Sequence, residues 1–236
     1  MSENETRIWS PPAVTEAGLR ALAELIALMV RPGDVIALEG DLGAGKTTFA
    51  RALIRALLGD DGAEVPSPTF PLVQTYRPSR LAVAHFDLYR LDDAAALDEI
   101  GFEDAVATGL VLVEWPERAG GRLPSERLEV RLAETGDAAT RRPTLTATGA
   151  FAGRLERLEA VAGLLRRAGW GEARARYLQG DASARKYARL SRDGRTAILM
   201  DAPRQPDGPP VRDGRPYSRI AHLAEDVTPF VAMATG

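Results

Sequence analysis

Hydrophobic residues recur at two different spacings along the first part of the chain, and these spacings predict its first helices and strand. Apolar residues three to four positions apart over residues 15–29 predict an amphipathic helix. The short apolar run at 34–39 predicts a strand, and residues 46–58 predict a second helix that Gly59 ends. Between that strand and the second helix, the glycine-rich residues 40–45 predict a turn.

The middle of the chain has the shorter repeats and runs that are typical of strands. Residues 109–115 form a fully apolar run that is closed by an acidic residue, which predicts a buried central strand. Residues 91–104 are acidic and predict a helix with a solvent-exposed charged face. Four further strands are predicted at 71–76, 81–86, 126–134 and 142–149. The last two of these, 126–134 and 142–149, alternate polar and apolar residues, so we expect them to form an exposed pair of strands.

The residue pattern changes after Gly153. Residues 155–167 predict an arginine-rich helix, in contrast to the strands that precede it. We therefore predict two domains, at residues 1–153 and 154–236.

The second domain contains a hairpin signal. Residues 186–190 and 196–200 read as strands, and Asp193 and Gly194 between them favour a tight hairpin turn. A loop rich in proline and glycine comes next, and the last apolar stretch is predicted to begin as a helix.

Composition restricts the class of protein. The chain has 236 residues, of which 45% are hydrophobic and 27% charged, as in ordinary globular proteins. It has no cysteine, which excludes disulfides, thiolate zinc sites and a cysteine nucleophile. The polar N-terminus lacks the features of a secretory signal, and the longest apolar region, residues 19–30, is too short to span a bilayer. We expect a cytoplasmic protein.

Residues 40–47 fit the phosphate-binding pattern G-x-x-x-x-G-K-[ST], with a predicted strand before them and a helix after them. Glycines let the backbone N–H groups of such a loop face phosphates, and the helix start favours an anion. We expect Lys46 to reach the β- and γ-phosphates of a nucleotide and Thr47 to hold Mg²⁺. The predicted nucleotide-binding residues of this loop are Gly40, Asp41, Leu42, Gly43, Ala44, Gly45, Lys46 and Thr47.

A phosphate-binding loop of this kind works with an acid at the end of a neighbouring strand, which directs the metal or a water molecule. Glu114 and Asp87 both come after apolar runs, and either can instead be an ordinary strand-end carboxylate. The sequence leaves open which acid serves the metal. His85 is more typical of a hydrogen-bonded packing residue than of a catalytic base, and Trp115 fits either the core or a stack on a nucleotide base.

The segment VPSPTF, residues 65–70, lies between the second helix and the next strand. Its prolines stiffen the chain, and Ser67 and Thr69 offer hydroxyls. In P-loop proteins this region senses the γ-phosphate in many cases, and the alternative is a rigid turn without such a role.

Four motifs carry a resemblance to a known family. In chain order they read GDLGAGKTTF, SPTF, HFDLYRL and VEWPE. Together they closely resemble the TsaE family, the bacterial P-loop ATPases of tRNA threonylcarbamoyladenosine synthesis, over about residues 10–150. The resemblance implies an α/β fold, a P-loop NTPase domain with a central sheet flanked by helices. It also implies hydrolysis of ATP with Mg²⁺ in an assembly with TsaD and TsaB, in which TsaD modifies the tRNA.

The resemblance also implies roles for single residues. Lys46, Thr47 and Thr48 would bind phosphate and magnesium. Asp87 and Glu114 match the two family acids, with the division between metal and water left open. The remaining positions would lie in the switch-like segment or near the nucleotide and partner surface; they are Ser67, Thr69, Tyr89, Arg90 and Trp115.

The second domain resembles a different family. Residues 169–190 and 197–203 look like the start of aminoglycoside-phosphotransferase-like kinases that phosphorylate amino sugars, with QGDAS at 179–183 as the nucleotide-covering turn. This resemblance implies a small α+β lobe, a partial kinase N-lobe. It is incomplete, because His222 is not followed by the Asp of a kinase catalytic loop.

Two alternatives to the ATPase interpretation stay open at this point. The chain could be a small-molecule kinase, although no catalytic loop or acceptor site is visible. Residues 155–236 carry 14 basic and 10 acidic residues, net +4, and could dock tRNA. Because the excess is small, a solvated arginine-rich surface is the simpler explanation of it.

Overall fold

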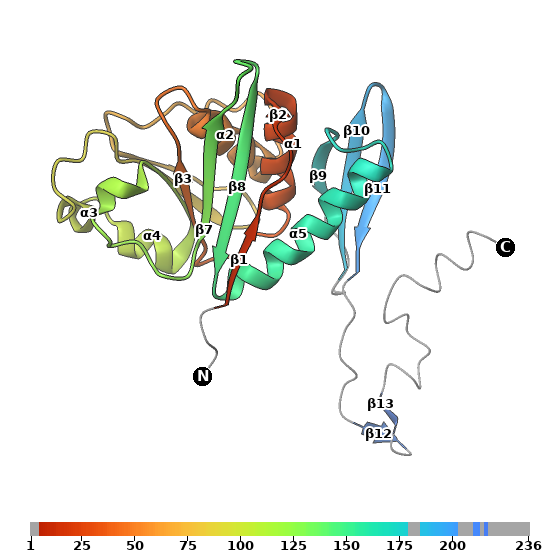
Figure 1. The fold of residues 1–236 in the computed structure, drawn as a ribbon. Coiled ribbons are helices and arrows are strands. Elements are labelled where there is room, and N and C mark those ends of the chain that lie inside the picture. Colours follow the sequence, from red (N-terminus) through yellow and green to blue (C-terminus); the bar gives the residue numbers. More distant parts are fainter. Residues whose placement is uncertain (1–4, 179–184, 203–209, 213–214, 217–236) are drawn as a thin grey trace.

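The computed structural model describes residues 5–178, 185–202, 210–212 and 215–216 (Figure 1). Its centre is an eight-stranded mixed sheet with the strand order β1-β8-β7-β3-β6-β5-β4, in which β2 also pairs with β8. The strands are β1 (Thr6–Trp9), β2 (Val14–Thr15), β3 (Val35–Glu39), β4 (Val73–Tyr76), β5 (Ala82–Asp87), β6 (Gly109–Glu114), β7 (Leu128–Glu134) and β8 (Thr140–Thr148).

The middle of the sheet is parallel. Strands β7, β3, β6 and β5 run in one direction, whereas β4 on one side and β8 on the other run in the opposite direction. Strand β1 pairs antiparallel with β8 and so runs in the same direction as the central strands. Strand β6 is buried along its whole length, as predicted, because helices cover both of its faces. Asp87 and Glu114 are register partners at the ends of β5 and β6, so both acids lie at the sheet edge where β3 enters the phosphate-binding loop.

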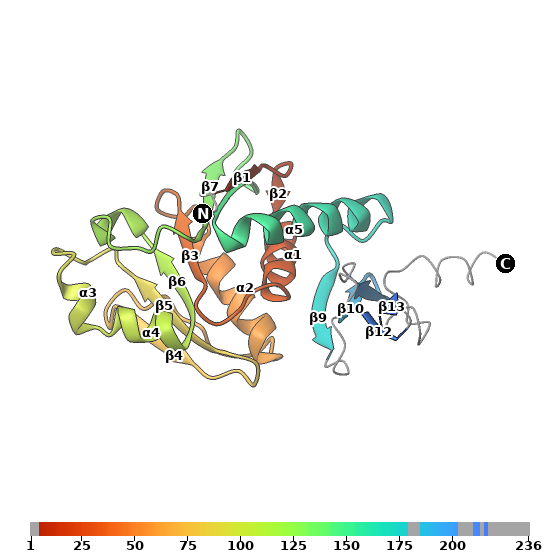
Figure 2. The same cartoon turned by 90° about the horizontal axis from the view of Figure 1, so that it is seen from below.

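Helices cover the two faces of the sheet separately. The helices α1 (Glu16–Ala27), α2 (Lys46–Leu58) and α5 (Ala150–Arg167) share one hydrophobic cluster with Ile36 and Leu38 of β3. On the other face of the sheet, residues of β3, β5 and β6 pack against α3 (Ala96–Glu99) and α4 (Phe102–Thr108) in a second cluster. Figure 2 shows α3 and α4 across the sheet from α1 and α5.

The predicted start and end of the first helices are close to those in the structure. The Thr15 side chain caps α1 by accepting a hydrogen bond from Gly18 N, and α1 ends two residues earlier than predicted. Helix α2 has the predicted bounds and ends at Gly59 in the left-handed conformation.

Two predictions for the middle of the chain need correction, and two short strands near the N-terminus were not predicted. The single helix expected at 91–104 is two short helices, because Gly101 between them has a φ of 74°. Strand β7 is not part of an exposed pair: it lies between β3 and β8, and its apolar residues Leu128, Val130 and Leu132 are buried. The short strands β1 and β2 escaped prediction because their pairing with β8 is entirely non-local.

The C-terminal part forms a second, antiparallel sheet of β9 (Arg174–Leu178), β10 (Lys186–Arg192) and β11 (Arg195–Asp201), in the order β11-β10-β9. The predicted hairpin is confirmed, with Asp193 and Gly194 at φ values of 51° and 74°. Strands β12 (Pro210–Arg212) and β13 (Arg215–Pro216) form a short pair. The turn predicted at 179–183, the terminal helix and His222 lie outside the described residues.

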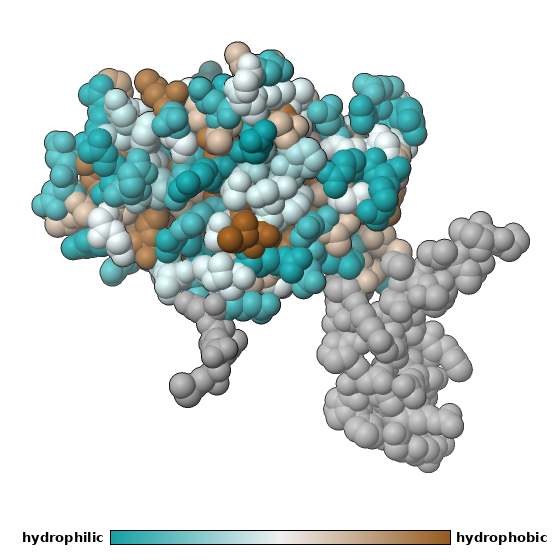
Figure 3. All heavy atoms as spheres, in the orientation of Figure 1, coloured by the Kyte–Doolittle hydropathy of each residue, from teal (hydrophilic) through white to brown (hydrophobic). Residues whose placement is uncertain are grey.

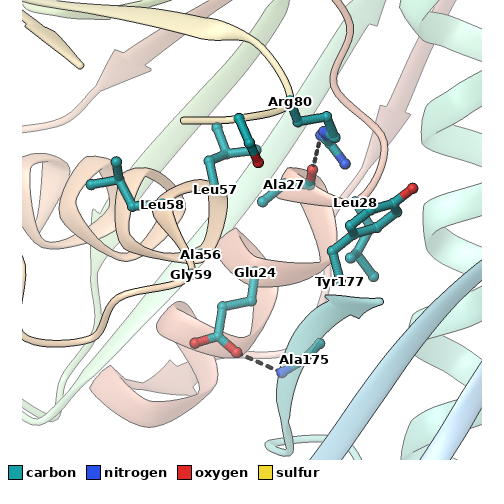
Figure 4. Close-up of a pocket in the computed structure, with 11 residues that line it drawn as sticks. Glu24, Ala27, Leu28, Ala56, Leu57, Leu58, Gly59, Arg80, Ala175 and Tyr177 are labelled. Carbon is teal, nitrogen blue, oxygen red and sulfur yellow. Dashed lines mark hydrogen bonds between the residues drawn. The ribbon is translucent and has the colours of Figure 1, made fainter. Parts of the chain in front are cut away.

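This second sheet packs against α1 and α2 (Figures 1 and 4). Glu24 of α1 is buried and accepts hydrogen bonds from Arg174 Nε at 2.5 Å and from Ala175 N at 2.6 Å. Nearby, Arg80 donates to Ala27 O, and its guanidinium lies 5.3 Å from the centre of the Tyr177 ring. One hydrophobic cluster therefore runs from α1 across residue 153 into β9, β10 and β11.

The face of the molecule in Figure 3 is mainly hydrophilic, with apolar side chains scattered in small patches. Within the described residues, no helix combines the length and the hydropathy that crossing a membrane requires.

Candidate functional site

The phosphate-binding loop joins β3 to α2 and needs its glycines. Gly43 and Gly45 have φ values of 81° and 104°, which side chains with a Cβ rarely adopt. A Cβ at Gly40 would lie 2.5 Å from Leu132 O. The loop thus keeps a shape in which its backbone and the first turn of α2 can face an anion.

Lys46, the first residue of α2, is held by its own loop. Its side chain is only 5% exposed, and Nζ donates to Gly40 O at 2.6 Å and to Asp41 O at 2.9 Å. Burial lowers the pKa of the Lys46 amine, while the nearby carboxylates of Glu114 and Glu117 oppose that effect. The amine can make three hydrogen bonds, so one remains for a phosphate oxygen.

Two aromatic rings, those of Trp115 and Tyr89, lie beside Lys46. Nζ lies 3.6 Å from the centre of the Trp115 ring, and the Tyr89 ring packs on Trp115 with centroids 5.0 Å apart. Trp115 has a φ of 60°, which is rare for a bulky residue, and Pro116 comes next at the start of a short 3₁₀ helix, η1 (Pro116–Ala119). This strained turn places one face of the indole against Lys46, while the ring also packs against the hydrophobic cluster under α3 and α4.

Glu114 connects the loop to the sheet. Its Oε2 accepts a hydrogen bond from Thr47 Oγ1 at 2.9 Å, and its Oε1 lies 2.8 Å from His85 Nε2. Both side chains are buried, at 2% exposure for Glu114 and 0% for His85. Because an ionised carboxylate only accepts, Nε2 is the ring nitrogen that carries hydrogen.

Asp87 has different neighbours. Its Oδ2 accepts from Ser67 Oγ and from Thr69 Oγ1, the latter at 2.8 Å, and its Oδ1 accepts from Tyr89 N at 3.1 Å. The hydroxyls of the VPSPTF segment are thus bound to Asp87, whereas the first turn of α2 is bound to Glu114. The two acids occupy separate hydrogen-bond networks.

The predicted site residues largely converge on one cavity of about 330 Å³. Gly40, Asp41 and Ala44 are in the loop but do not line it, and the Arg90 guanidinium lies 4.4 Å from the Phe70 ring centre instead. The cavity is lined by Leu42, Gly43, Gly45, Lys46, Thr47, Thr48, Ser67, Thr69, Asp87, Tyr89, Glu114 and Trp115.

One contributor was missed at the level of sequence. Arg141 of β8 donates to Ala44 O at 3.2 Å and to Gly43 O at 3.3 Å, which braces the loop from outside. It lies 97 residues from Ala44 in the chain, and no motif marks it.

The chemistry of the cavity fits a magnesium nucleotide. Mg²⁺ in such sites takes one or two protein ligands, and phosphates and water supply the rest. Thr47 Oγ1 and the Glu114 carboxylate, in contact at the first turn of α2, provide that minimal set. Among the described residues, no group of three or more His, Cys, Asp or Glu side chains is placed to hold a metal ion.

Comparison with known proteins assigns the family. A family model described as "Threonylcarbamoyl adenosine biosynthesis protein TsaE" matches residues 13–143. The chain belongs to the TsaE family. The matched segment of this TsaE-family chain includes the loop, both acids, the VPSPTF segment and Arg141, and it ends before α5 and the second sheet.

Individual relatives agree with the family match. The chain is 42% identical over 118 residues to the "tRNA threonylcarbamoyladenosine biosynthesis protein TsaE" of Rickettsia conorii, covering 50% of this chain and 67% of the relative. The protein of the same name from Bacillus subtilis is 39% identical over 131 residues, covering 55% and 80%. The crystal structure of YdiB from Bacillus subtilis matches with a TM-score of 0.50 at 33% identity, over 72% of this chain and 99% of that one.

Proposed function

We propose that this TsaE-family chain binds and hydrolyses ATP with Mg²⁺ in the cytoplasm, in support of tRNA threonylcarbamoyladenosine formation. The observation that carries the proposal is the contact between Thr47 and Glu114, which joins a phosphate-binding loop to a buried acid in one cavity. The curated relatives carry the biosynthetic role in their names.

Each residue of the cavity has a role in this proposal. Lys46 and the loop backbone hold the phosphates, and Thr47, Thr48 and Glu114 serve phosphate and metal. Bound magnesium would neutralise charge on the phosphates during transfer. Glu114 is the metal-directing acid because it contacts Thr47.

Asp87 is assigned to the attacking water in the same proposal. Its carboxylate accepts hydrogen bonds from Ser67 and Thr69 of the VPSPTF segment and makes none to the phosphate-binding loop. All three residues line the cavity. An acid in that position can orient a water molecule, and a change in the conformation of the VPSPTF segment would move it. Trp115 and Tyr89 close the cavity above Lys46.

The rim of the cavity supports an assembly with TsaD and TsaB, through which the chain would act on tRNA indirectly. Leu42 and Tyr89 line the cavity and are 78% and 43% exposed. Large apolar side chains gathered around one opening favour a protein partner.

ATP hydrolysis by residues 1–236, alone and with added TsaB and TsaD, tests the proposal. We expect a low basal rate that the pair raises and that Lys46→Ala abolishes. A rate indifferent to TsaB and TsaD would contradict the role in tRNA modification, and retained turnover in Lys46→Ala would contradict the assignment of the ATPase site.

For residues 154–236 we retain the interpretation as a partial kinase-like N-lobe, supported by the antiparallel sheet β9–β11 that comes after α5. Incubation with ATP and amino sugars followed by mass spectrometry tests whether it phosphorylates a sugar, and we expect no product. The alternative of a tRNA-docking surface is weakened because Arg174 and Arg176 are paired with Asp61.

A further inference from the structure

We propose that His85 is a positioning residue that orients the Glu114 carboxylate toward Thr47 and toward the magnesium of a bound nucleotide. The inference rests on the proposed function, because it deepens the role of the same site. It extends the interpretation of His85 as a hydrogen-bonded packing residue.

The hydrogen bonds of Glu114 fix both of its oxygens. His85 Nε2 lies 2.8 Å from Oε1, and Thr47 Oγ1 donates to Oε2 at 2.9 Å. With one bond on each oxygen, the plane of the carboxylate cannot rotate without breaking a bond. His85 therefore helps to hold the carboxylate in the orientation that presents one oxygen to the first turn of α2.

The sheet register explains why His85 reaches Glu114. His85 of β5 is the register partner of Leu112 of β6, and Glu114 lies two residues further along β6, so all three side chains point to the same face. That face also carries Val83, Leu110 and Leu112, which belong to the same hydrophobic cluster as residues of α2. The imidazole and the carboxylate thus meet diagonally beneath the start of α2.

Burial gives this contact its strength. His85 is fully buried and Glu114 is 2% exposed, so their hydrogen bond lies in surroundings of low polarity, where such a bond is stronger than in water. Its other ring nitrogen, Nδ1, has no hydrogen-bond partner within the described part of the chain. A ring kept for packing alone would be more stable as an apolar side chain, because burying a polar atom without a partner costs free energy. Its bond to Glu114 is the polar contribution that an apolar side chain could not make.

Three substitutions in the full chain separate orientation from packing. His85→Phe keeps a ring and removes the donor. His85→Gln places an amide nitrogen near the position of Nε2, and His85→Asn stops near the position of Nδ1. ADP binding is measured by calorimetry across a Mg²⁺ titration and again in EDTA, so the readout does not depend on turnover.

We expect His85→Phe and His85→Asn to raise the Mg²⁺ concentration for half-maximal enhancement of ADP affinity by about 10- to 100-fold. In EDTA the ADP affinity should change by less than about 3-fold, because the loop itself is intact. His85→Gln should return the Mg²⁺ requirement to within about 3-fold of wild type.

The inference is overturned if His85→Phe and His85→Asn keep the wild-type Mg²⁺ requirement, or if all three variants lose ADP affinity equally with Mg²⁺ and with EDTA. If His85→Phe does not fold, the contrast between Asn and Gln decides.

Glu114→Gln distinguishes failure of this inference from failure of the proposed function. If Glu114→Gln also leaves the Mg²⁺ requirement unchanged, the metal assignment fails together with the role of His85. If Glu114→Gln raises the requirement and the His85 variants do not, only the role of His85 fails.

Discussion

The Thr47 hydroxyl donates a 2.9 Å hydrogen bond to Glu114 Oε2, which joins two residues 67 positions apart in the chain. Thr47 lies in the first turn of α2, directly after the loop that leaves β3, and Glu114 ends β6. Strands β3 and β6 are parallel neighbours, so the residues at their carboxyl ends meet at one edge of the sheet. The site is therefore a consequence of sheet order, and several measurements can test it.

Lys46→Ala should lower ATP affinity by at least about 10-fold and abolish turnover, because a charged donor to the phosphates is lost. The chain has only two lysines, and the other provides a matched control. Lys186 donates to Leu28 O at 3.3 Å, in the contact between the second sheet and α1. Lys186→Ala should bind ATP like wild type in the same calorimetric titration. Equal losses in both variants would indicate a general loss of folding instead.

Glu114→Gln and Asp87→Asn should fail in different ways, because the two acids belong to separate networks. Glu114→Gln should raise the Mg²⁺ requirement of nucleotide binding by roughly 10- to 100-fold. Asp87→Asn should bind magnesium nucleotide nearly normally and lose turnover by roughly 100-fold or more. Calorimetry and steady-state hydrolysis on both variants check this division. The reverse pattern would exchange the roles of the two acids.

The local part of this site was predictable from sequence. A strand, a glycine-rich loop and a helix are contiguous in the chain, so residues 34–58 could be assigned from spacing alone. The acids at 87 and 114 were visible as strand ends for the same reason. The proposed division of roles between Glu114 and Asp87 could not be predicted, because it rests on which strand lies beside β3.

Other features of the site depend on contacts that no local pattern reports. Arg141 reaches the loop from β8, and Trp115 turns toward Lys46 through a backbone conformation that a tryptophan rarely adopts. Glu24 of α1 carries no local sequence signal of its buried role. Its partners Arg174 and Ala175 lie 150 and 151 residues away.

Trp115 should report nucleotide binding by fluorescence. In this structure the Lys46 amine lies 3.6 Å from the indole centre, and a phosphate that draws the amine away changes the surroundings of the ring. Adding ADP should change the intrinsic fluorescence of the wild type, and Trp115→Phe should remove that change. Trp170→Phe is the control, because Trp170 contacts Arg195 in the second sheet. A signal that survives in Trp115→Phe would contradict this assignment.

Glu24→Ala should loosen the second sheet from the first domain. The buried carboxylate accepts from Arg174 Nε and Ala175 N, and its removal leaves both donors unpaired at the contact with α1. Arg174 still forms its ion pair with Asp61 in this variant, and its side chain is partly exposed. We therefore expect the free energy of unfolding in urea to fall by about 2–3 kcal/mol, less than for a fully buried ion pair.

Hydrogen exchange distinguishes loosening of this contact from a uniform loss of stability. The amide of Ala175 should exchange faster in Glu24→Ala, while amides of β3 and β6 keep their protection, because the central sheet does not depend on Glu24. Glu16→Ala, at an exposed position in the first turn of the same helix, should cost no more than about 1 kcal/mol. If Glu24→Ala and Glu16→Ala behave alike, the second sheet is not held by Glu24. If β3 and β9 lose protection together, the two sheets unfold as one unit, as the hydrophobic cluster that spans residue 153 allows.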